Sequence, residues 1–282
     1  MSSDSLYDVL SFRDLGDGRF EGDSVDELGH GVVFGGQLLA QAVVLATDAV
    51  EGKELLSLHT TFARGATPAT PLEYDVEVQQ AGRAFANATV TASQGGKVCT
   101  RSLALLHDPS PDLIRHGSAM PDVAGPDSLP GRDGWWDIRV VDGVDIGDPA
   151  AVGPAELRVW TRFPGAPADG GPLLAQALLA YASDGFLIGT AMRPHEGYGQ
   201  SMAHREISTT VLAQTLQFHE RFAPDEWLLL DHSSSYAGRG RSQGRADVFT
   251  QDGRLVASYS QVNMIRDFPQ GAAPAAGERA KF

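Results

Sequence analysis

The chain has 282 residues, and its 22 Lys and Arg against 36 Asp and Glu give a formal net charge of −14, which argues against nucleic acid as a partner. Hydrophobic residues make up 42% of the chain and charged residues 21%, an ordinary globular composition that excludes wholesale disorder. This length fits one large domain or two domains of common size.

The first part of the chain predicts one buried helix and an antiparallel sheet. Residues 12–20 predict a strand pair that starts the sheet. Residues 37–50 are rich in Ala and Leu on almost every face, which indicates a mostly buried helix that begins after Gly35-Gly36. Alternating apolar and polar residues predict further strands at 55–62, 72–79, 86–92 and 98–106.

The second part repeats this order of elements. Residues 108–133 are rich in Asp, Pro, Gly and Ser and predict a linker. A strand pair is expected at 135–140 and 156–163, followed by an apolar helix over 172–192 with Pro172 in its first turn. The later strands are expected at 211–218, 227–232, 244–249 and 255–264.

An internal repeat relates the two parts. Residues 35–42 read GGQLLAQA and residues 170–177 read GGPLLAQA, an offset of 135. Ala81-Gly82-Arg83 recurs as Ala237-Gly238-Arg239, an offset of 156. The difference, 156 − 135 = 21, corresponds to extra residues in the second copy. We interpret this insertion, at 193–208, as a loop over a site.

Two copies of a sheet curled around a helix predict an α+β protein with a double hot-dog fold. Each repeat would wrap its antiparallel sheet around its central helix, because each element must bury its apolar face against another. We expect an N-terminal repeat at 1–107, a linker at 108–133, and a C-terminal repeat at 134–282 that carries the active site.

Four motifs spread over nearly the whole chain carry a resemblance to a known family. They read HGVVFGGQ at 30–37, LAYASD at 179–184, FHERF at 218–222 and TQDGRLVAS at 250–258. Together they resemble the type II acyl-CoA thioesterases, which are double hot-dog enzymes. The resemblance implies hydrolysis of acyl-CoA to free fatty acid and coenzyme A, by a water that an Asp, a hydroxyl residue and a Gln activate. It also implies a homo-oligomer.

The resemblance places the catalytic Asp at Asp184 and the Gln at Gln261. The family's Thr or Ser falls on Val211, so this chain departs from the pattern there. Three nearby residues carry hydroxyl groups: Thr209, Thr210 and Thr215. Because a strand alternates its faces, Thr209 and Thr215 should point the same way as Val211. Of these we prefer Thr215 as the third catalytic residue.

The residues themselves support the same two positions. Asp184 interrupts an apolar helix, where burial would raise the pKa of a carboxyl group and suit it to act as a general base. A carboxylate that caps a loop or faces solvent would explain Asp184 equally well. Gln261 can donate and accept hydrogen bonds at once, which suits it to hold a water. The matching residues of the first copy are Ala49 and Ala104, so we expect one active site per chain.

An acyl-CoA substrate needs a cationic entrance and an apolar slot. Arginines that could meet the phosphates are Arg83, Arg239, Arg241 and Arg245. Phenylalanines that could line the slot are Phe34, Phe62, Phe186 and Phe218. Ordinary solvated arginines and core packing explain these two sets as well.

The sequence also contains features that other classes of enzyme share. Residues 240–244 (GRSQG) match the nucleophile elbow of serine hydrolases, but they lie between predicted strands instead of at a strand-to-helix turn. The eight histidines show no zinc-ligand spacing, so we expect no metal and no cofactor. A non-catalytic acyl-CoA binding protein and an enoyl-CoA hydratase stay open as alternatives, although a hydratase would need a His closer to Asp184 than His195.

The cysteine content and the N-terminal sequence bear on location. Cys99 is the only cysteine, so no internal disulfide can form. Residues 1–14 lack the basic start and the apolar core of a signal peptide. We expect no apolar run to reach the roughly 18–20 residues that span a bilayer. We therefore expect a soluble, cytoplasmic protein without a membrane span.

Overall fold

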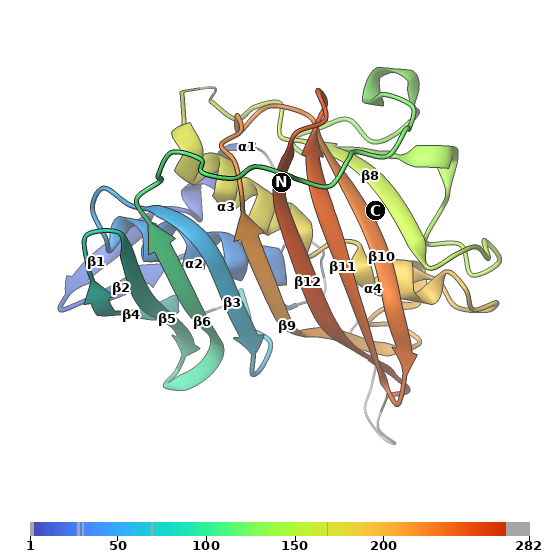
Figure 1. The fold of residues 1–282 in the computed structure, drawn as a ribbon. Helices are drawn as coiled ribbons and strands as arrows, with labels where there is room; N and C mark the ends of the chain where they lie inside the picture. The colour runs from blue at the N-terminus through green and yellow to red at the C-terminus, as the bar shows by residue number, and fades with distance from the viewer. Residues whose placement is uncertain (1–2, 27–28, 30, 69, 168, 269–282) are drawn as a thin grey trace.

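One antiparallel sheet curves around two central helices in the computed structural model of the chain (Figure 1). The structure describes residues 3–26, 29, 31–68, 70–167 and 169–268. The sheet has twelve strands in the order β1-β2-β4-β5-β6-β3-β9-β12-β11-β10-β8-β7, so each half of the sheet comes from one half of the chain. This arrangement confirms the predicted α+β double hot-dog architecture.

The strands lie close to their predicted positions. The first half contains α1 (Ser3–Asp8), β1 (Phe12–Gly16), β2 (Arg19–Gly22), α2 (Gly35–Asp48), β3 (Glu54–Phe62), β4 (Leu72–Ala81), β5 (Phe85–Gln94) and β6 (Lys97–His107). The second half contains β7 (Asp137–Val140), β8 (Glu156–Arg162), α3 (Gly171–Ser183), α4 (Leu187–Met192), β9 (Ser208–Phe218), β10 (Leu228–Gly238), β11 (Arg241–Thr250) and β12 (Leu255–Arg266). Short 3-10 turns are η1 (Pro126–Ser128), η2 (Val141–Gly143) and η3 (Gln200–Met202).

The two halves of the sheet join where β3 pairs with β9. His59 lies opposite Thr215, and its Nδ1 is 2.8 Å from the Thr215 hydroxyl. These two residues are 156 positions apart, which is the offset of the strand repeat. A shift by 156 also exchanges the neighbouring pairs, Leu58 opposite Leu216 and Thr60 opposite Gln214. The sequence repeat therefore corresponds to a pseudo-twofold symmetry of the structure, and its axis passes through the junction of β3 and β9.

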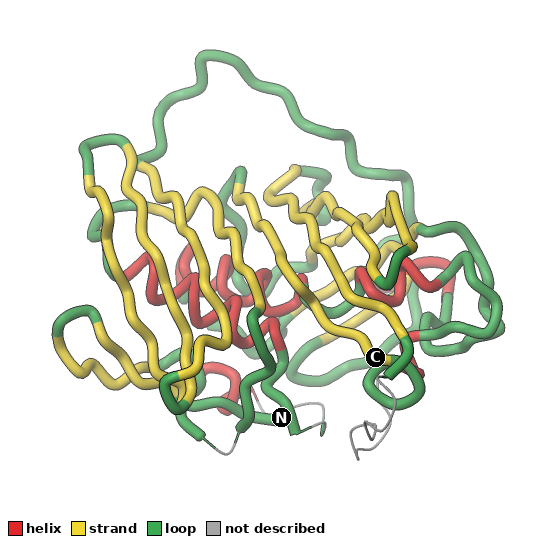
Figure 2. The backbone as a smooth tube through the Cα atoms, turned by 90° about the horizontal axis from the view of Figure 1, so that it is seen from below, coloured by secondary structure: helices red, strands yellow, loops and turns green. Residues whose placement is uncertain are grey.

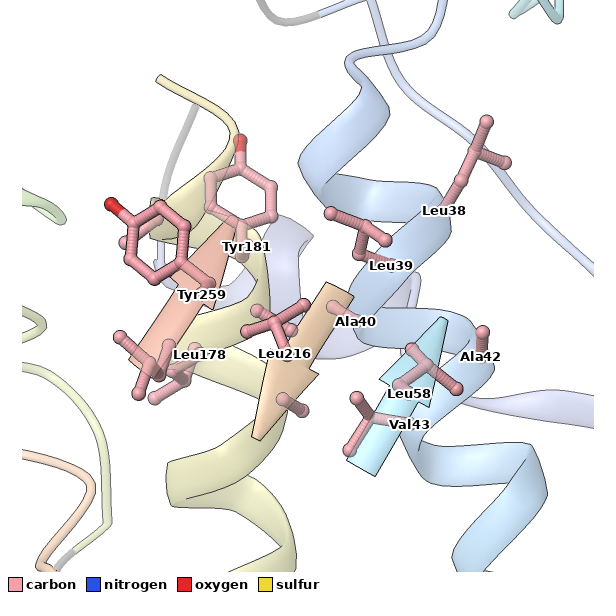
Figure 3. Close-up of a cluster of buried hydrophobic side chains, with 14 of the residues drawn as sticks. Leu38, Leu39, Ala40, Ala42, Val43, Leu58, Leu178, Tyr181, Leu216 and Tyr259 are labelled. Carbon is pink, nitrogen blue, oxygen red and sulfur yellow. The ribbon is translucent and has the colours of Figure 1, made fainter. Parts of the chain in front are cut away.

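Helices α2 and α3 fill the inner side of the sheet. Leu39 and Val43 of α2, Leu178 of α3, Leu58 of β3 and Leu216 of β9 belong to one buried cluster (Figure 3). Each such Leu or Val contributes roughly 1.5–3 kcal/mol when it is fully removed from water. The helices are apolar all round because helix and sheet neighbours surround them.

The helix predicted over 172–192 is two helices. α3 ends at Ser183 with Asp184 as its C-terminal cap, and α4 starts at Leu187. The Gly185 amide donates to the Ala182 carbonyl, three residues back, which tightens the last turn and stops the helix. Asp184 therefore lies at a helix end and not inside a helix as predicted.

The stretch from α3 through α4, Gly171–Met192, is long and apolar enough to cross a membrane, judged by length and composition alone. The expectation that no stretch is long enough was therefore wrong. In the structure 78% of its most apolar 18-residue segment is buried inside the protein. The position of this stretch between the sheet and α2 accounts for its apolar character. The lack of a membrane span stays a prediction.

Residues 108–133, the predicted linker, cross the outer face of the sheet, on the side away from the helices (Figures 1 and 2). Met120 and Val123 pack there against a cluster that contains Trp160, Trp227 and Phe249. The Trp160 indole donates to the Ala124 carbonyl at 3.0 Å. The linker thus covers outward-facing aromatic rings that would otherwise meet water.

Candidate active site

The end of α3 meets the beginning of α2 at Asp184. A Cβ atom on Gly35 would lie 2.7 Å from Asp184 Oδ2, and one on Gly36 would collide with the Tyr181 carbonyl oxygen. The Gly36 amide donates a hydrogen bond to the Asp184 carboxylate. The Gly35-Gly36 pair is therefore required for this close approach, whereas His30 of the same motif lies outside the described residues.

Burial controls the ionisation of Asp184. Removal from water raises the pKa of this carboxyl group to about 7, because the charged form loses its solvation. The hydrogen bond from Gly36 acts in the opposite direction and favours the carboxylate. At neutral pH the group is therefore poised between its acid and base forms, as a general base requires.

Gln261 of β12 lies beside Asp184, as the resemblance implied. Its side-chain Nε2 is 3.3 Å from Asp184 Oδ1 and 2.6 Å from Gln214 Oε1. Gln261 is 1% exposed, and its Oε1 has no hydrogen-bond partner within the described part of the chain. The structure thus brings two of the three predicted residues together and leaves one buried acceptor free.

Thr215 does not belong to this group, which corrects the preference stated above. A β-bulge at Leu212 separates two stretches of β9, since Val262 pairs with Ala213 and Asn263 pairs with Val211. The extra residue reverses the alternation of faces. Thr215 consequently points to the outer face, where it bonds to His59, and not to the face of Val211.

The bulge brings Thr209 to the inner face in place of Thr215. Thr209 is 3% exposed, and its Oγ1 has no hydrogen-bond partner among the described residues. It lines the same cavity as Asp184 and Val211. Thr210 also lines this cavity, but it is exposed. Thr209, which the sequence left as an alternative, is therefore the buried threonine hydroxyl of β9 in the cavity wall.

A cavity of about 300 Å³ opens beside Asp184. Its apolar wall includes Val33, Phe34, Leu38, Phe62, Ile188 and Val211. The loop that corresponds to the sequence insertion contributes Gln200 and His204 to the cavity wall. The Gln200 Nε2 donates to the Gly185 carbonyl at 2.9 Å and ties this loop to the residue after Asp184.

Of the phenylalanines and arginines predicted to meet the substrate, two phenylalanines line the cavity and the others lie elsewhere. Phe34 and Phe62 line the cavity, whereas Phe186 packs against Trp136 and Phe218 lines a separate cavity. The arginine of the cavity wall is Arg64, which was not singled out. The proposed phosphate-binding arginines, Arg83, Arg239, Arg241 and Arg245, are absent from the described wall.

The serine of the GRSQG segment is not a nucleophile elbow. Ser242 lies in β11 directly after the hairpin from β10, so the strand-to-helix turn of a hydrolase elbow is missing at this position. Its side chain is 1% exposed and accepts a hydrogen bond from Asn263 Nδ2. This arrangement agrees with the strand prediction for the segment.

Gln214 is a site residue that the sequence analysis missed. It contacts Gln261 from β9, and it is 1% exposed. The repeat contained a signal, because the matching residue of the first copy, 156 positions earlier, is Leu58. A glutamine that replaces a core leucine in one copy alone indicates a polar site.

A second cavity of about 290 Å³ lies at the pseudo-symmetric position. It is lined by Glu54, Leu55 and Phe218, which the repeat relates to Thr210, Val211 and Phe62 in the wall of the first cavity. The residues of the first copy that match Asp184 and Gln261 are Ala49 and Ala104. The Asp and Gln pair is thus present at one of the two related cavities.

Comparisons with known proteins point to one family. The family models described as acyl-CoA thioesterase N-terminal domain and C-terminal domain match residues 25–107 and 116–265. Acyl-CoA thioesterase 2 of Haemophilus influenzae is 30% identical over 93% of this chain and 97% of its own length. Acyl-coenzyme A thioesterase 8 of Mus musculus is 27% identical over 84% of this chain and 81% of its own. The crystal structure of acyl-CoA thioesterase II TesB2 from Mycobacterium marinum has a TM-score of 0.78 and 30% identity, covering 96% of this chain and all 100% of that chain.

Proposed function

Because the chain belongs to the acyl-CoA thioesterase family, we propose that it hydrolyses acyl-CoA thioesters with a water held at the Asp184 cavity. The contact between the Asp184 carboxylate and the Gln261 carboxamide beside this cavity supports the proposal most directly. The three residues proposed to handle the water are Asp184, Gln261 and Thr209. Thr209 takes the place that the sequence analysis gave to Thr215.

Asp184 acts as the base in this scheme. Its carboxylate removes a proton from the water as the water oxygen attacks the thioester carbonyl carbon. The tetrahedral intermediate then collapses, the carbon–sulfur bond breaks, and the proton passes from Asp184 to the departing thiolate. The products are a carboxylic acid and the thiol of coenzyme A, and Asp184 returns to its ionised form. A pKa of about 7 suits a group that must both accept and release a proton near neutral pH.

Gln261 and Thr209 position the water. The free Oε1 of Gln261 can accept a hydrogen bond from it, while the Nε2 holds the carboxylate that takes its proton. The Thr209 hydroxyl adds a further donor or acceptor at the cavity wall. The Gly36 amide donates to Asp184 and the Gln37 amide donates to the Phe34 carbonyl, so the first amide of α2, that of Gly35, is the helix donor left to stabilise the negative charge on the carbonyl oxygen.

The cavity wall suits an acyl thioester. Phe34, Leu38 and Phe62 provide apolar surface for the acyl group, and Arg64 provides a positive charge at the same cavity. An arginine beside an apolar slot is the combination that a fatty acyl group attached to a phosphate-bearing carrier requires.

The test is release of free thiol from a series of acyl-CoA substrates of increasing chain length. Asp184→Asn and Gln261→Ala should each lower kcat, by about 10²-fold or more for the loss of the base. Asp48→Asn is the matched control, because Asp48 ends α2 as Asp184 caps α3, but it is exposed and outside the cavity wall. Full turnover in Asp184→Asn would refute the mechanism. Binding of acyl-CoA without turnover in the unaltered protein would favour the binding-protein alternative.

The oligomeric state and the location of the protein stay predictions. We propose a cytoplasmic homo-oligomer, on the resemblance and the sequence features given above. Light scattering coupled to size-exclusion chromatography would measure the oligomer mass, and cell fractionation would test the location.

A further inference from the structure

A continuous chain of buried hydrogen bonds runs from Ser183 to Asp184 through two glutamines. The Gln214 Nε2 is 2.5 Å from Ser183 Oγ, and the Gln214 Oε1 is 2.6 Å from the Gln261 Nε2. The Gln261 Nε2 also reaches Asp184 Oδ1 at 3.3 Å. Ser183, Gln214 and Gln261 are between 0% and 1% exposed. Water cannot therefore replace any of these contacts without rearrangement of the core.

The direction of each hydrogen bond is set from the Ser183 end. The Ser183 hydroxyl donates to the Ala180 carbonyl at 2.7 Å, so its oxygen is left to accept from the Gln214 NH₂ group. This turns the Gln214 carboxamide oxygen towards Gln261. The Gln261 NH₂ group must then face Gln214 and Asp184, and its Oε1 is the end that stays free.

The reversed orientation of Gln261 would bring acceptors together. If its carboxamide rotated by half a turn, its oxygen would face the Gln214 oxygen and the Asp184 carboxylate, and no proton would lie between them. Buried polar groups without partners are costly, and more so beside a charge. Gln214 therefore excludes an orientation that Asp184 alone, in its protonated form, would tolerate.

The fold does not need this polar chain. The first copy has Leu58 and Ala104 where the second has Gln214 and Gln261, and both are buried there. Buried apolar residues at the matching positions are thus compatible with the same sheet. A buried polar group that the related copy replaces with a hydrocarbon points to a role in chemistry.

We propose that Gln214, anchored by Ser183, is a positioning residue that fixes the orientation of the Gln261 carboxamide for thioester hydrolysis. It keeps the Gln261 NH₂ group on Asp184 and the Gln261 oxygen free for the attacking water. This role rests on the proposed function of Asp184 and Gln261, and it assigns to Gln214 no contact with the substrate.

The test combines Gln214→Met with Gln261→Ala in a double-mutant cycle on acyl-CoA hydrolysis. Methionine is close to glutamine in length but cannot hold the Gln261 NH₂ group. We expect Gln214→Met to lower kcat by about tenfold, the scale of a supporting hydrogen bond behind an active-site group, with KM changed by less than about twofold. In the Gln261→Ala background the same substitution should lower kcat no further, because the group it positions is gone.

Thr60→Val is the matched control. Thr60 pairs directly with Gln214 across β3 and β9, it is fully buried, and its hydroxyl is 2.7 Å from Ser102 Oγ. The substitution removes a buried hydrogen bond next to Gln214 and leaves the hydrogen bonds of Gln261 in place, so kcat should not change. Ser183→Ala is a second, milder probe in case Gln214→Met does not fold, and its smaller loss of kcat should also vanish in the Gln261→Ala background.

The outcomes separate this role from the proposed function. An unchanged kcat in Gln214→Met, or an equal loss of kcat with and without Gln261, would overturn the positioning role alone. A kcat loss in Thr60→Val equal to that in Gln214→Met would also overturn it, because general loosening of the core would then explain both. Wild-type kcat in Gln261→Ala would overturn the proposed function and the positioning role with it.

Discussion

Replacement of Asp184 by asparagine should lower activity by about 10²-fold or more, and it should raise stability relative to the unaltered protein by an amount that grows from pH 5 to pH 8. The carboxyl group has a pKa of about 7 in the folded protein and about 3.9 in an unfolded chain. Between these values the folded state keeps a proton that the unfolded state has released. The free energy of unfolding therefore falls as the pH rises through this window, and it falls no further above pH 7.

The magnitude follows from the width of that window. Each pH unit inside it costs about 1.4 kcal/mol, so the unaltered protein should lose about 3 kcal/mol from this group between pH 5 and pH 8. Asparagine does not titrate, and all other ionisable groups are shared by the two proteins. The gain in stability of Asp184→Asn should therefore grow by about 3 kcal/mol over the same range.

Urea unfolding at pH 5, 6, 7 and 8 would measure this difference. Any constant offset from altered hydrogen bonds to Gly36 and Gln261 cancels, because the quantity of interest is the change with pH. Two stability curves that run parallel from pH 5 to pH 8 would refute the reasoning, since Asp184 would then ionise as in an unfolded chain.

Three further predictions concern the residues around Asp184. Thr209→Val should lower kcat by about tenfold or more, whereas Thr215→Val on the outer face should leave it unchanged, as steady-state thiol release would show. A hydroxyl returned to the inner face by Val211→Thr should restore part of the activity of Thr209→Val, and no recovery would count against a water-positioning role for Thr209. Gly36→Ala should lower kcat, and it should lower the free energy of unfolding by about 1–3 kcal/mol, seen as a lower melting temperature. The reason is that the added Cβ collides with the Tyr181 carbonyl and separates α2 from α3.

The strands were predictable because their signal is local. Alternation of apolar and polar residues over a few positions marks a strand with one buried face, and β5 and β6 show it clearly. The end of α3 was not predictable in this way. Residues 184–186 lie between two apolar helical stretches, so the apolar pattern continues across the point where α3 ends.

The hydroxyl of the site could not be predicted, because it depends on one extra residue in a strand. Alternation along β9 put Thr215 on the same face as Val211, and this holds for a regular strand. The bulge at Leu212 reverses it, and a bulge is defined by how two strands pair. Alternation counted from Val211 put Gln214 on the outer face for the same reason, although its match to Leu58 in the repeat marked it as a core position.

The sequence by itself determined the two-fold repeat, the order of the elements, and the restriction of Asp184 and Gln261 to the second copy, because each of these is written in residue type and spacing along the chain. The tertiary structure alone decided the contact between α2 and the end of α3, the face of Thr209, and the hydrogen bonds that join Gln214 to Gln261. These features arise where segments distant in the chain meet, and their energies depend on burial and pairing that no single segment has before it folds.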